Sequence, residues 1–430
     1  MFIYKTAVVG GGAMGAEIAQ AITFSGVPVL LKDVDQARVD KGLEVIRKIY
    51  QRRVDRGKMT PEDMEQKMAL VTGTTTYEPF GDVDLAIEAV PENLPLKQRI
   101  FKELNEAAPQ TAILASNTSS LSISALGGVT NRPHKVIGMH FFYPAHIMKL
   151  VEVIPGLETS EETVADTTAF AESLRKLPIR VNECPGFLVN RILMPYLNEA
   201  AFCAQEGGAS VKQIDEAMSA FGFPMGPFTL VDNLGFDVCR DVVQILVDAY
   251  GDRMQPAAIW ERLYRAGRYG AKSGSGFYLY GDRAGQPDAE LDAILKALGA
   301  NATEAGTPPG GEVAEGSAEG RRRRPTVKGE FSVNRLVLPM VNEAIRCLEE
   351  RVCTAAEVDL AVIAGLGFPQ SKGGMLHYAD QIGLDTVLDE LQRLTKQLGS
   401  RFWPSPLLKR KVAAGQLGTK THKGFFEYTA

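Results

Sequence analysis

Hydrophobic residues in the first 155 positions come in short runs separated by longer stretches of mixed polarity. Six of these runs have the β-branched, aliphatic character of strands: "TAVVG", "VPVLLKD", "VDLAIEAV", "TAILASN", "KVIGMHFF" and "LVEVI". The stretches between them have a helical character, so strands and helices alternate along the chain. This alternation predicts βαβ units and a mostly parallel sheet.

The pattern changes near Cys184, where the strand-like runs stop. "GFLVNRILMPYLNEAAFCAQEG" and "SVKQIDEAMSAF" place their apolar residues at helical spacing. We therefore expect an α/β domain over residues 1–183 and a helical domain over residues 184–285. Residues 286–327 are predicted to be a flexible linker, because Gly, Ala, Glu and Pro dominate most of this stretch. Its run Arg321–Arg324 indicates a solvated charge cluster, with an anion site as the alternative.

The helical part of the chain is repeated. "GFLVNRILMPYLNEA" at 186–200 recurs as "EFSVNRLVLPMVNEA" at 330–344. Two further blocks follow in the same order: "VKQIDEAMSAFGFP" aligns with "AAEVDLAVIAGLGFP", and "GAKSGSGFYLY" with "GTKTHKGFFEY". Three matched blocks in order indicate a duplication. The prediction is a second helical domain over residues 328–430 that repeats the first and has no βαβ domain of its own.

Composition narrows the function classes. A chain of 430 residues with 45% hydrophobic content is long enough for two or three globular domains. The net charge of −5 argues against a general nucleic-acid binder. Lys5 interrupts the N-terminal apolar run, so we expect no secretory signal. The sequence contains no run of 18 apolar residues, so we expect no membrane span. Five cysteines without CxxC spacing argue against a disulfide framework or a zinc site, which favours a cytoplasmic protein without a bound metal.

A glycine-rich turn follows the first predicted strand. "GGGAMG" sets Gly10, Gly12 and Gly15 at GxGxxG spacing, with Ala13 and Met14 in the same turn, before the helical stretch "AEIAQAITF". Such a turn lets a pyrophosphate approach the backbone N–H groups at a helix N-terminus. The next predicted strand ends in Asp33, an acid that suits an adenosine ribose diol and repels a 2′-phosphate. The combination predicts a Rossmann-type domain that binds NAD rather than NADP; the alternative is a glycine turn in an unrelated α/β protein.

A candidate base lies near the end of "KVIGMHFF". Reacting groups in open parallel sheets gather beyond the carboxyl ends of the strands, where His140 and the segment Asn117–Ser119 are both expected. Histidine is suited to taking a proton from an alcohol near neutral pH. Glu152, boxed in by apolar residues in "LVEVI", is the expected carboxylate partner because a buried glutamate needs one. A histidine of purely structural role in the core or a turn is the alternative.

These residues carry a family resemblance. The chain resembles the L-3-hydroxyacyl-CoA dehydrogenases, especially the dehydrogenase half of the multifunctional fatty-acid oxidation enzymes. The resemblance extends over nearly the whole chain, through "VVGGGAMGAEIAQ", "AIEAVPENLPLKQRIF", "LASNTSSL", "GMHFFYPAHIMKLVEVI", "CPGFLVNRILMPYLNEA" and "FGFPMGPFTLVDNLGFDV". It implies a Rossmann-type NAD-binding domain followed by two repeated all-α domains, with an acyl-CoA as substrate.

The resemblance also implies roles for single residues. It makes His140 the catalytic base and Glu152 the residue that orients it. Ser119 and Asn190 are implied to hydrogen-bond the reacting oxygen. The cofactor-binding positions that it implies are those of the glycine turn and Asp33, together with Glu92, Lys97 and Asn117. Without the resemblance, "PENLPLK" at 91–97 would indicate only a solvated helix start.

The implied reaction is NAD-dependent oxidation of an L-3-hydroxyacyl-CoA to a 3-ketoacyl-CoA. One alternative is a 3-hydroxybutyryl-CoA dehydrogenase that works in the reductive direction. Another is a dehydrogenase of small free β-hydroxyacids. Those enzymes use a lysine as the base, so the presence of the His140 and Glu152 pair argues against this alternative. A relative that binds NAD or acyl-CoA without catalysis is the third.

The resemblance raises two further expectations. The second helical copy is expected to replace a partner subunit, and enoyl-CoA hydratase and thiolase are the implied functional partners. One position departs from the family, because Tyr143 stands where an asparagine is usual after "HFF". We expect this bulkier phenol to narrow the pocket or to alter the choice of substrate.

Overall fold

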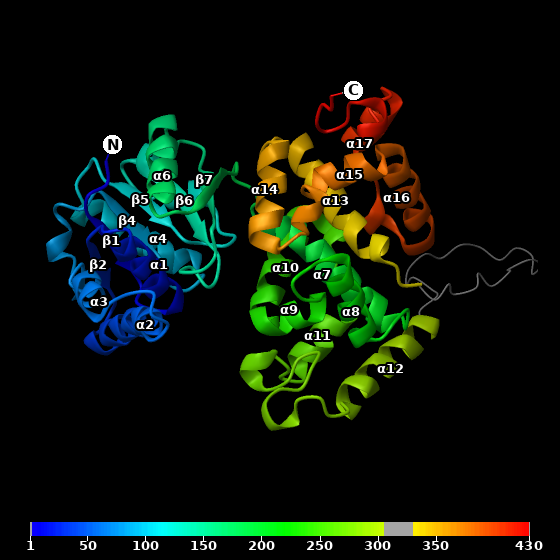
Figure 1. Cartoon of the computed structure of the whole chain (residues 1–430), viewed down its shortest axis with the longest axis horizontal. Helices are drawn as coiled ribbons and strands as arrows, with labels where there is room; N and C mark the ends of the chain where they lie inside the picture. The colour runs from blue at the N-terminus through cyan, green and yellow to red at the C-terminus, as the bar shows by residue number, and fades with distance from the viewer. Residues whose placement is uncertain (1, 305–329, 430) are drawn as a thin grey trace, which may run out of the picture. The chain divides into compact units, whose positions relative to one another are not determined.

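The computed structural model describes residues 2–304 and 330–429, and its contacts divide the chain into two compact units (Figure 1). The first unit consists of residues 1–190 and 347–366, and the second of residues 191–346 and 367–430. Each unit therefore joins two segments that are distant in sequence. Residues 347–366 belong to the second helical copy, yet they are part of the unit that holds the α/β domain.

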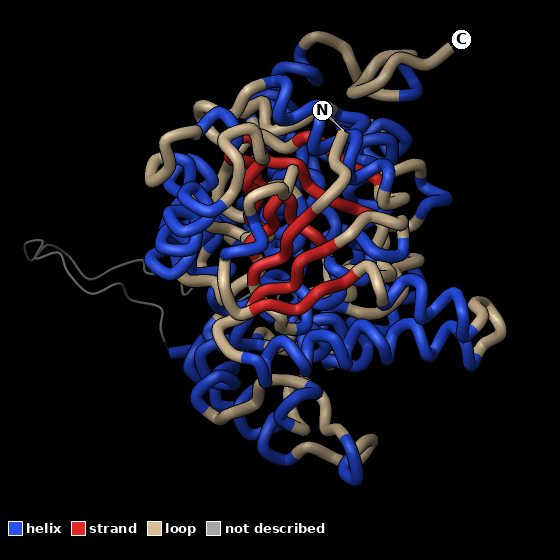
Figure 2. The backbone as a smooth tube through the Cα atoms, turned by 90° about the vertical axis from the view of Figure 1, so that its left-hand side faces the viewer, coloured by secondary structure: helices blue, strands red, loops and turns tan. Residues whose placement is uncertain are grey.

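Eight strands form one sheet in the first unit (Figure 2). They are β1 (Thr6–Val9), β2 (Val29–Lys32), β3 (Val71–Thr74), β4 (Leu85–Glu88), β5 (Ile113–Ser116), β6 (Val136–Phe141), β7 (Leu150–Pro155) and β8 (Leu177–Arg180). Their order is β3-β2-β1-β4-β5-β6-β7-β8. Pairing is parallel as far as β6, whereas β7 runs antiparallel to β6 and β8 is parallel to β7. The predicted mostly parallel sheet is confirmed.

Two edge strands, β3 and β8, were not expected from the apolar pattern. Their sequences are "VTGT" and "LPIR", and each has one fully buried residue. The central strands β1, β2, β4 and β5 are buried at every position. An edge strand is covered on fewer sides, so its sequence carries a weaker hydrophobic signal.

Helices cover this sheet. Those of the first unit are α1 (Ala13–Phe24), α2 (Gln36–Asp55), α3 (Pro61–Met68), α4 (Leu94–Ala107), α5 (Ile123–Gly127), α6 (Glu161–Ser173) and α14 (Ala355–Leu366). Helix α4 packs on β4 and β5, α6 on β6, β7 and β8, and α14 on β7 and β8. The buried aliphatic residues of strands and helices form one core, which includes Val8, Ile22, Leu31, Ile87, Ile113, Met139 and Val153. This core fixes the strand ends that carry the site.

The second unit is helical. Its elements are α7 (Val189–Gln205), α8 (Val211–Phe221), α9 (Pro227–Leu234), α10 (Phe236–Tyr250), α11 (Ala258–Arg265), α12 (Ala289–Glu304), α13 (Val333–Glu349), α15 (Met375–Ile382), α16 (Leu384–Leu398) and α17 (Pro406–Ala413), with α7 starting, and α13 ending, in the first unit. The run from α13 to α17 repeats the order and approximate lengths of the run from α7 to α11. The predicted duplication is therefore confirmed in the order of the elements.

The two copies also pair with each other reciprocally. Arg191 Nε lies 2.8 Å from Glu343 Oε1, and Arg335 Nε lies 2.6 Å from Glu199 Oε1. Arg335 and Glu343 are the repeat counterparts of Arg191 and Glu199. All four side chains are buried. Such reciprocal contacts are typical of an isologous interface, here formed within one chain.

The predicted linker is wrong over part of its range. Residues 289–304 form helix α12, which packs on α11. Its stretch "AELDAILKAL" contains strong helix formers, and Leu291 is buried. The Gly- and Pro-rich sequence begins after this helix, outside the described residues, and averaging over the whole stretch hid the helix. The run Arg321–Arg324 lies outside the described residues. Among the helices of the described residues, none is long and apolar enough to cross a bilayer.

Candidate active site

A histidine and a glutamate meet on neighbouring strands. The antiparallel register of β6 and β7 places His140 directly opposite Glu152. His140 Nδ1 lies 2.7 Å from Glu152 Oε2. The His140 residue is 5% exposed and Glu152 is fully buried. The pair predicted from sequence is thus brought together by cross-strand pairing.

The Glu152 carboxylate has further donors. Its Oε1 accepts hydrogen bonds from the backbone N–H of Leu188 at 3.0 Å and of Val189 at 2.9 Å, where helix α7 begins. These two N–H groups and the imidazole satisfy the hydrogen-bonding capacity of the buried carboxylate. An ionised Glu152 accepts the proton of His140 Nδ1, so the neutral ring keeps its free lone pair on Nε2. This is the tautomer that a general base needs.

Aromatic rings flank the His140 imidazole. The ring centroids of Phe142 and Phe187 lie 4.6 Å and 5.9 Å from that of His140. Phe187 is 1% exposed and lies directly before the two residues that bind Glu152. The rings restrict the movement of the imidazole and limit its contact with water.

Asn190 and the loop after β5 come together beside this pair. Asn190 Nδ2 lies 3.3 Å from the carbonyl oxygen of Ser119. Asn117 lies in the same loop, and its Oδ1 accepts the backbone N–H of Phe141 at 2.8 Å. Asn117 therefore holds the end of β6 next to His140. The four predicted catalytic residues lie on β6, β7, the loop after β5 and the start of α7.

Glu92 binds the same loop. Its Oε1 accepts the Thr118 hydroxyl at 2.6 Å, the Ser119 N–H at 2.9 Å and the Ser120 hydroxyl at 3.2 Å. Its Oε2 lies 3.4 Å from Lys97 Nζ. The structure therefore gives Glu92 a role in shaping the loop that presents Ser119, in addition to the cofactor contact that stays a prediction.

Lys97 is buried rather than solvated. It is 1% exposed, and its ammonium donates to Glu88 Oε1 at 2.7 Å and to the Val90 carbonyl at 3.1 Å. Glu88 also accepts the Ser116 hydroxyl at 2.6 Å. The sequence reasoning missed Glu88, although its position in the apolar run "LAIEAV" is the same signal that identified Glu152.

The glycine turn fits a dinucleotide. Gly10 has a φ of 110°, and a Cβ on Gly15 would lie 1.8 Å from the Gly10 carbonyl oxygen, so both positions require glycine. Gly12 is exposed, has open space beside it, and caps helix α1 without a side chain. The first N–H groups of α1 therefore have no side-chain cap, which suits pyrophosphate binding at a helix N-terminus. Ala13 and Met14 form the first turn of α1.

Asp33 follows β2 beside this turn. Its Oδ2 accepts the Gly11 N–H at 2.7 Å, and its Oδ1 accepts the Val34 N–H at 2.7 Å. The carboxylate is partly exposed and keeps acceptor capacity for a diol. Its position next to the glycine turn matches the ribose contact that the sequence predicts.

Comparison with known proteins decides the family. Residues 5–184 match the NAD-binding domain of 3-hydroxyacyl-CoA dehydrogenases. Residues 186–280 and, separately, 331–428 match the C-terminal domain of the same enzymes. The chain belongs to the 3-hydroxyacyl-CoA dehydrogenase family.

Individual members of the 3-hydroxyacyl-CoA dehydrogenase family resemble most of the chain. Proteins named fatty acid oxidation complex subunit alpha from Psychrobacter arcticus and Pseudomonas syringae are 37% and 38% identical to it over 96% of its length. The chain spans only 56% and 55% of those proteins, about half their length. The solved 3-hydroxybutyryl-CoA dehydrogenase of Escherichia coli is 27% identical, with a TM-score of 0.81 over 96% of this chain and 99% of its own. The (S)-3-hydroxybutyryl-CoA dehydrogenase of Ralstonia eutropha is 40% identical, with a TM-score of 0.64 over 65% of this chain and 100% of its own.

Tyr143, which stands where the family resemblance implies an asparagine, lies in the loop after β6, three residues after His140. It is 65% exposed, and Ile147 in the same loop is equally so. The loop backbone is held by Glu17 of α1, whose Oε2 accepts the Ala145 N–H at 2.5 Å, and by Lys176. Lys176 Nζ donates to the carbonyls of Ala145 and Met148 at 2.5 Å and 2.7 Å. Sequence reasoning missed both Glu17 and Lys176; "GAEIA", a glutamate in an apolar helix, was the available signal for the first.

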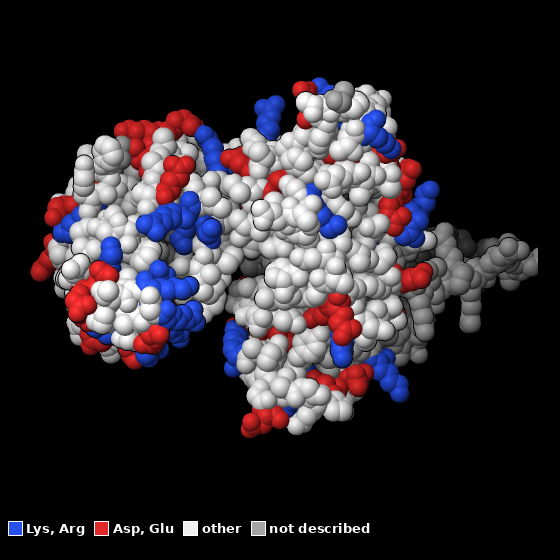
Figure 3. Space-filling model, in the orientation of Figure 1, with Lys and Arg blue, Asp and Glu red and all other residues white. Residues whose placement is uncertain are grey.

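A basic hollow of about 360 Å³ opens next to that loop. Its basic lining residues are Arg52, Arg53, Arg56, Lys58, His146, Lys149, Arg175 and Lys176. Figure 3 shows Lys and Arg side chains gathered on this side of the first unit, near α2. Burial lowers the pKa of Lys176 to about 8, and the negative charge of Glu17 opposes that shift. So many cations around one hollow favour a ligand with several phosphates.

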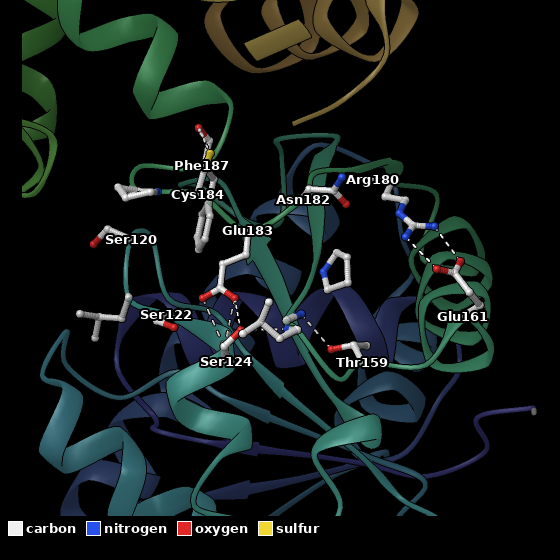
Figure 4. Close-up of a pocket in the computed structure, with 15 residues that line it drawn as sticks. Ser120, Ser122, Ser124, Thr159, Glu161, Arg180, Asn182, Glu183, Cys184 and Phe187 are labelled. Atoms are coloured by element: carbon white, nitrogen blue, oxygen red, sulfur yellow. Dashed lines mark hydrogen bonds and ion pairs between the residues drawn. The ribbon is translucent and has the colours of Figure 1, made fainter. Parts of the chain in front are cut away.

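A second cavity, of about 650 Å³, lies between the segment Asn182–Phe187 and the start of α5 (Figure 4). The Glu183 carboxylate points into it and binds the Ser124 hydroxyl. Phe187 contributes to the wall of this cavity and also packs near His140. Among the described residues, no group of His, Cys, Asp and Glu side chains is arranged to hold a metal ion.

Proposed function

We propose that this chain oxidises L-3-hydroxyacyl-CoA to 3-ketoacyl-CoA with NAD, and that His140 is the general base. The observation that carries the proposal is the His140 and Glu152 pair at 2.7 Å, next to Asn190 and Ser119, in an NAD-binding domain of this family. When bound, NAD supplies the acceptor for the hydride that leaves carbon 3 of the substrate.

The chain itself handles the proton. His140 Nε2 takes the proton of the 3-hydroxyl group, while Nδ1 stays hydrogen-bonded to Glu152. The carboxylate stabilises the imidazolium that forms, and Leu188 and Val189 hold the carboxylate in place. The Ser119 hydroxyl and the Asn190 amide are proposed to donate hydrogen bonds to the oxygen as its bond to carbon 3 becomes a carbonyl. The proton on His140 then passes to water.

The basic hollow supports a coenzyme A ester as the substrate. Coenzyme A carries a diphosphate and a 3′-phosphate, and three arginines at the end of α2, Arg52, Arg53 and Arg56, line the hollow. Lys149, in the loop after β6, and Lys176, after α6, line it as well. We propose that this hollow receives the phosphates. A thioester without them would lose that attraction.

An absorbance assay tests the proposed function. Acetoacetyl-CoA should oxidise NADH, and the His140→Gln variant should lose at least about 100-fold in kcat because general-base catalysis contributes this much. NADH affinity, measured by fluorescence, should stay within about two-fold of wild type, since His140 is outside the glycine turn. Unchanged turnover in His140→Gln would overturn the role of His140. Absence of turnover in the wild type with every chain length would overturn the reaction.

The phosphate proposal has its own test. Acetoacetyl-pantetheine lacks the phosphates of acetoacetyl-CoA but keeps the reacting end. Arg52→Ala combined with Arg53→Ala should raise KM for acetoacetyl-CoA by about ten-fold or more, because each lost charged contact is worth about 1.5 kcal/mol or more. KM for the pantetheine ester should not change. Equal effects on both substrates would contradict the assignment of the hollow.

A second candidate function is reduction of acetoacetyl-CoA as a 3-hydroxybutyryl-CoA dehydrogenase. The two solved dehydrogenases of Escherichia coli and Ralstonia eutropha carry that name and support it. Turnover of a chain-length series of 3-hydroxyacyl-CoA and 3-ketoacyl-CoA esters separates the two. A sharp optimum of kcat/KM at four carbons, with faster reduction by NADH than oxidation by NAD, favours the reductive enzyme. Activity that extends to long acyl chains favours fatty-acid oxidation.

The relatives' name also bears on partners. Proteins named fatty acid oxidation complex subunit alpha work in an assembly, and we propose that this chain shares its substrates with an enoyl-CoA hydratase and a thiolase. The hydratase product is the proposed substrate, and the thiolase substrate is the proposed product. Co-purification with either enzyme from the native source would support the proposal, and free diffusion of all three would contradict it.

A further inference from the structure

The segment from Arg180 to Asn190 supplies the groups that hold the catalytic pair. Leu188 and Val189 donate to Glu152, and Asn190 donates to the Ser119 carbonyl. The segment links β8 to the start of α7, and Figure 4 shows it running over the larger cavity. A backbone of this kind needs external support if it is to fix a carboxylate within a few tenths of an ångström.

One end of the segment is held by residues of the second helical copy. The Asn182 N–H donates to the Val352 carbonyl at 2.7 Å, and Asn182 Nδ2 donates to the Arg351 carbonyl at 2.8 Å. The Arg180 N–H lies 3.2 Å from Glu357 Oε1, in the first turn of α14. These three contacts attach the segment to the turn before α14 and to its beginning.

Arg351 adopts a backbone conformation that favours glycine over residues with a side chain. Its φ is 59°, in the left-handed region. The counterpart in the first copy is Gly207, with a φ of 73°. The second copy therefore keeps the same turn with a residue that is more strained in this conformation. The carbonyl of this residue accepts the hydrogen bond from Asn182.

The other end of the segment meets the last turn of α14. A Cβ added to Gly365 would lie 2.7 Å from Leu150 Cδ2 and 3.5 Å from Val189 Cγ2. Leu150 is two residues before Glu152 on β7, and Val189 donates to Glu152. At Gly365, α14 therefore lies close to two side chains next to the catalytic carboxylate. One is Leu150 on the strand of Glu152, and the other is Val189, whose N–H donates to Glu152.

The first copy has no residue that corresponds to Gly365. Helix α14 has 12 residues where α8 has 11, and the matching runs Ala217–Ala220 and Ala361–Ala364 leave Gly365 as the added residue. The glycine therefore occurs only in the second copy, where it lies against Leu150 and Val189.

We infer that α14 and the turn before it are a positioning element for the catalytic pair. They brace residues 180–190 so that Glu152 stays aligned with His140 and Asn190 stays on the Ser119 loop. The second helical copy, which lacks a βαβ domain of its own, then contributes to catalysis through its position. This inference rests on the proposed role of His140.

Gly365→Val tests the brace, with Ala220→Val at the exposed end of α8 as the control. The valine should push against Leu150 and Val189 and lower kcat by about 10- to 100-fold per NADH-binding site, as small misplacements of catalytic groups do. Counting sites by NADH titration removes any loss due to unfolded protein. The dissociation constant for NADH should stay within about two-fold, and Ala220→Val should behave like wild type in every measurement.

A second pair of variants keeps the inference falsifiable if Gly365→Val fails to fold. Asn182→Ala removes the side-chain contact to Arg351 in an exposed position and should lower kcat by a few fold with an unchanged NADH dissociation constant. Combining Gly365→Val with Leu150→Ala should recover part of the lost kcat, because it removes the atom nearest to the new side chain. Normal kcat in both Gly365→Val and Asn182→Ala would overturn the inference. His140→Gln separates the two proposals: if it keeps full turnover, the role of His140 fails; if it is inactive while both brace variants are normal, only the brace fails.

Discussion

At the residue scale, buried acids carry most of the organisation of the site. Glu152 binds His140, Glu88 binds Lys97 and Ser116, and Glu17 binds the loop after β6. Each is a glutamate among apolar neighbours, and each is satisfied by hydrogen bonds that its own element cannot provide. Burial of a charge is costly unless it is paired, so such residues indicate where distant segments meet.

Asp33 provides a prediction about the cofactor. Replacing it by serine removes a charged acceptor from the ribose side and should raise KM for NADH about ten-fold or more, since such a hydrogen bond is worth about 1.5 to 3 kcal/mol. The preference for NADH over NADPH should fall as well, because a carboxylate repels a 2′-phosphate. Steady-state kinetics with both cofactors measures this.

Asp35→Asn is the control for that experiment. Asp35 caps α2 by accepting the Arg38 N–H, and asparagine keeps the cap while removing a charge two residues from Asp33. Its kinetics should match wild type. An equal loss in Asp35→Asn would mean that net charge, and not the hydrogen bond of Asp33, sets cofactor affinity.

At the element scale, helix α9 is tied to a distant turn by one aspartate. Asp232 accepts the N–H groups of Phe277 at 2.8 Å and Tyr278 at 2.9 Å, and the Tyr280 hydroxyl at 2.9 Å. Asp380 of α15 makes the same set with Phe425, Phe426 and Tyr428. Glycine is required opposite both, because a Cβ on Gly276 or Gly424 would lie 2.0 Å from the carboxylate. The duplicated unit therefore kept its internal clamp twice.

This clamp predicts a pH dependence of stability. Burial raises the pKa of Asp232 to about 6, although its three donors oppose the shift. A folded-state pKa above the unfolded value of about 4 favours folding while the group is protonated, so this stability is lost as pH rises from about 4 through about 6. Compared with Asp232→Asn, the wild type should lose about 3 kcal/mol of unfolding free energy for the second unit over that interval.

Urea denaturation at several pH values measures this difference. Tyr280→Phe removes one donor to the carboxylate and keeps the ring, so it should extend the loss to higher pH. Parallel stability curves for the wild type and Asp232→Asn would contradict the prediction.

At the scale of the whole molecule, duplication has put both halves of a pair interface into one chain. The Arg191 and Glu343 contact and the Arg335 and Glu199 contact are repeat counterparts. Gly222 and Gly367 pack on Pro369 and Pro224 in the same reciprocal manner. A surface satisfied within one chain is not available to a second chain.

We therefore expect a monomer at micromolar concentrations by light scattering. An obligate dimer that uses α7 or α13 would contradict the expectation. Glu343→Gln and Glu199→Gln should each destabilise the second unit by about 1.5 to 3 kcal/mol, because each removes a carboxylate from a buried arginine, although Arg335 keeps its contact with Glu206 at 2.6 Å. Glu216→Gln, on the exposed face of α8, is the control and should change stability by less than about 0.5 kcal/mol. Unequal effects at Glu199 and Glu343 would show that the two halves of the interface are not equivalent.

Local sequence was sufficient for much of the fold. The apolar runs predicted six of the eight strands and the parallel sheet, because central strands are buried on both faces and their sequences reflect it. The repeated blocks predicted two helical copies, because the two copies still share identical residues at matching positions. The edge strands were missed because they are covered on fewer sides and carry a weaker hydrophobic signal. Helix α12 was missed because its helix formers were averaged with the Gly- and Pro-rich sequence that follows.

The site divides in the same way. The sequence determined the residue types and their order: the glycine turn, Asp33, His140 and the glutamate among apolar residues that pairs with it. Tertiary structure alone decided that Leu188 and Val189 hold Glu152 and that Glu92 shapes the loop of Ser119. It also decided that α14 from the second copy braces residues 180–190. Hydrogen bonds to backbone groups and close approaches at glycine depend on where distant segments lie, and a linear pattern records neither.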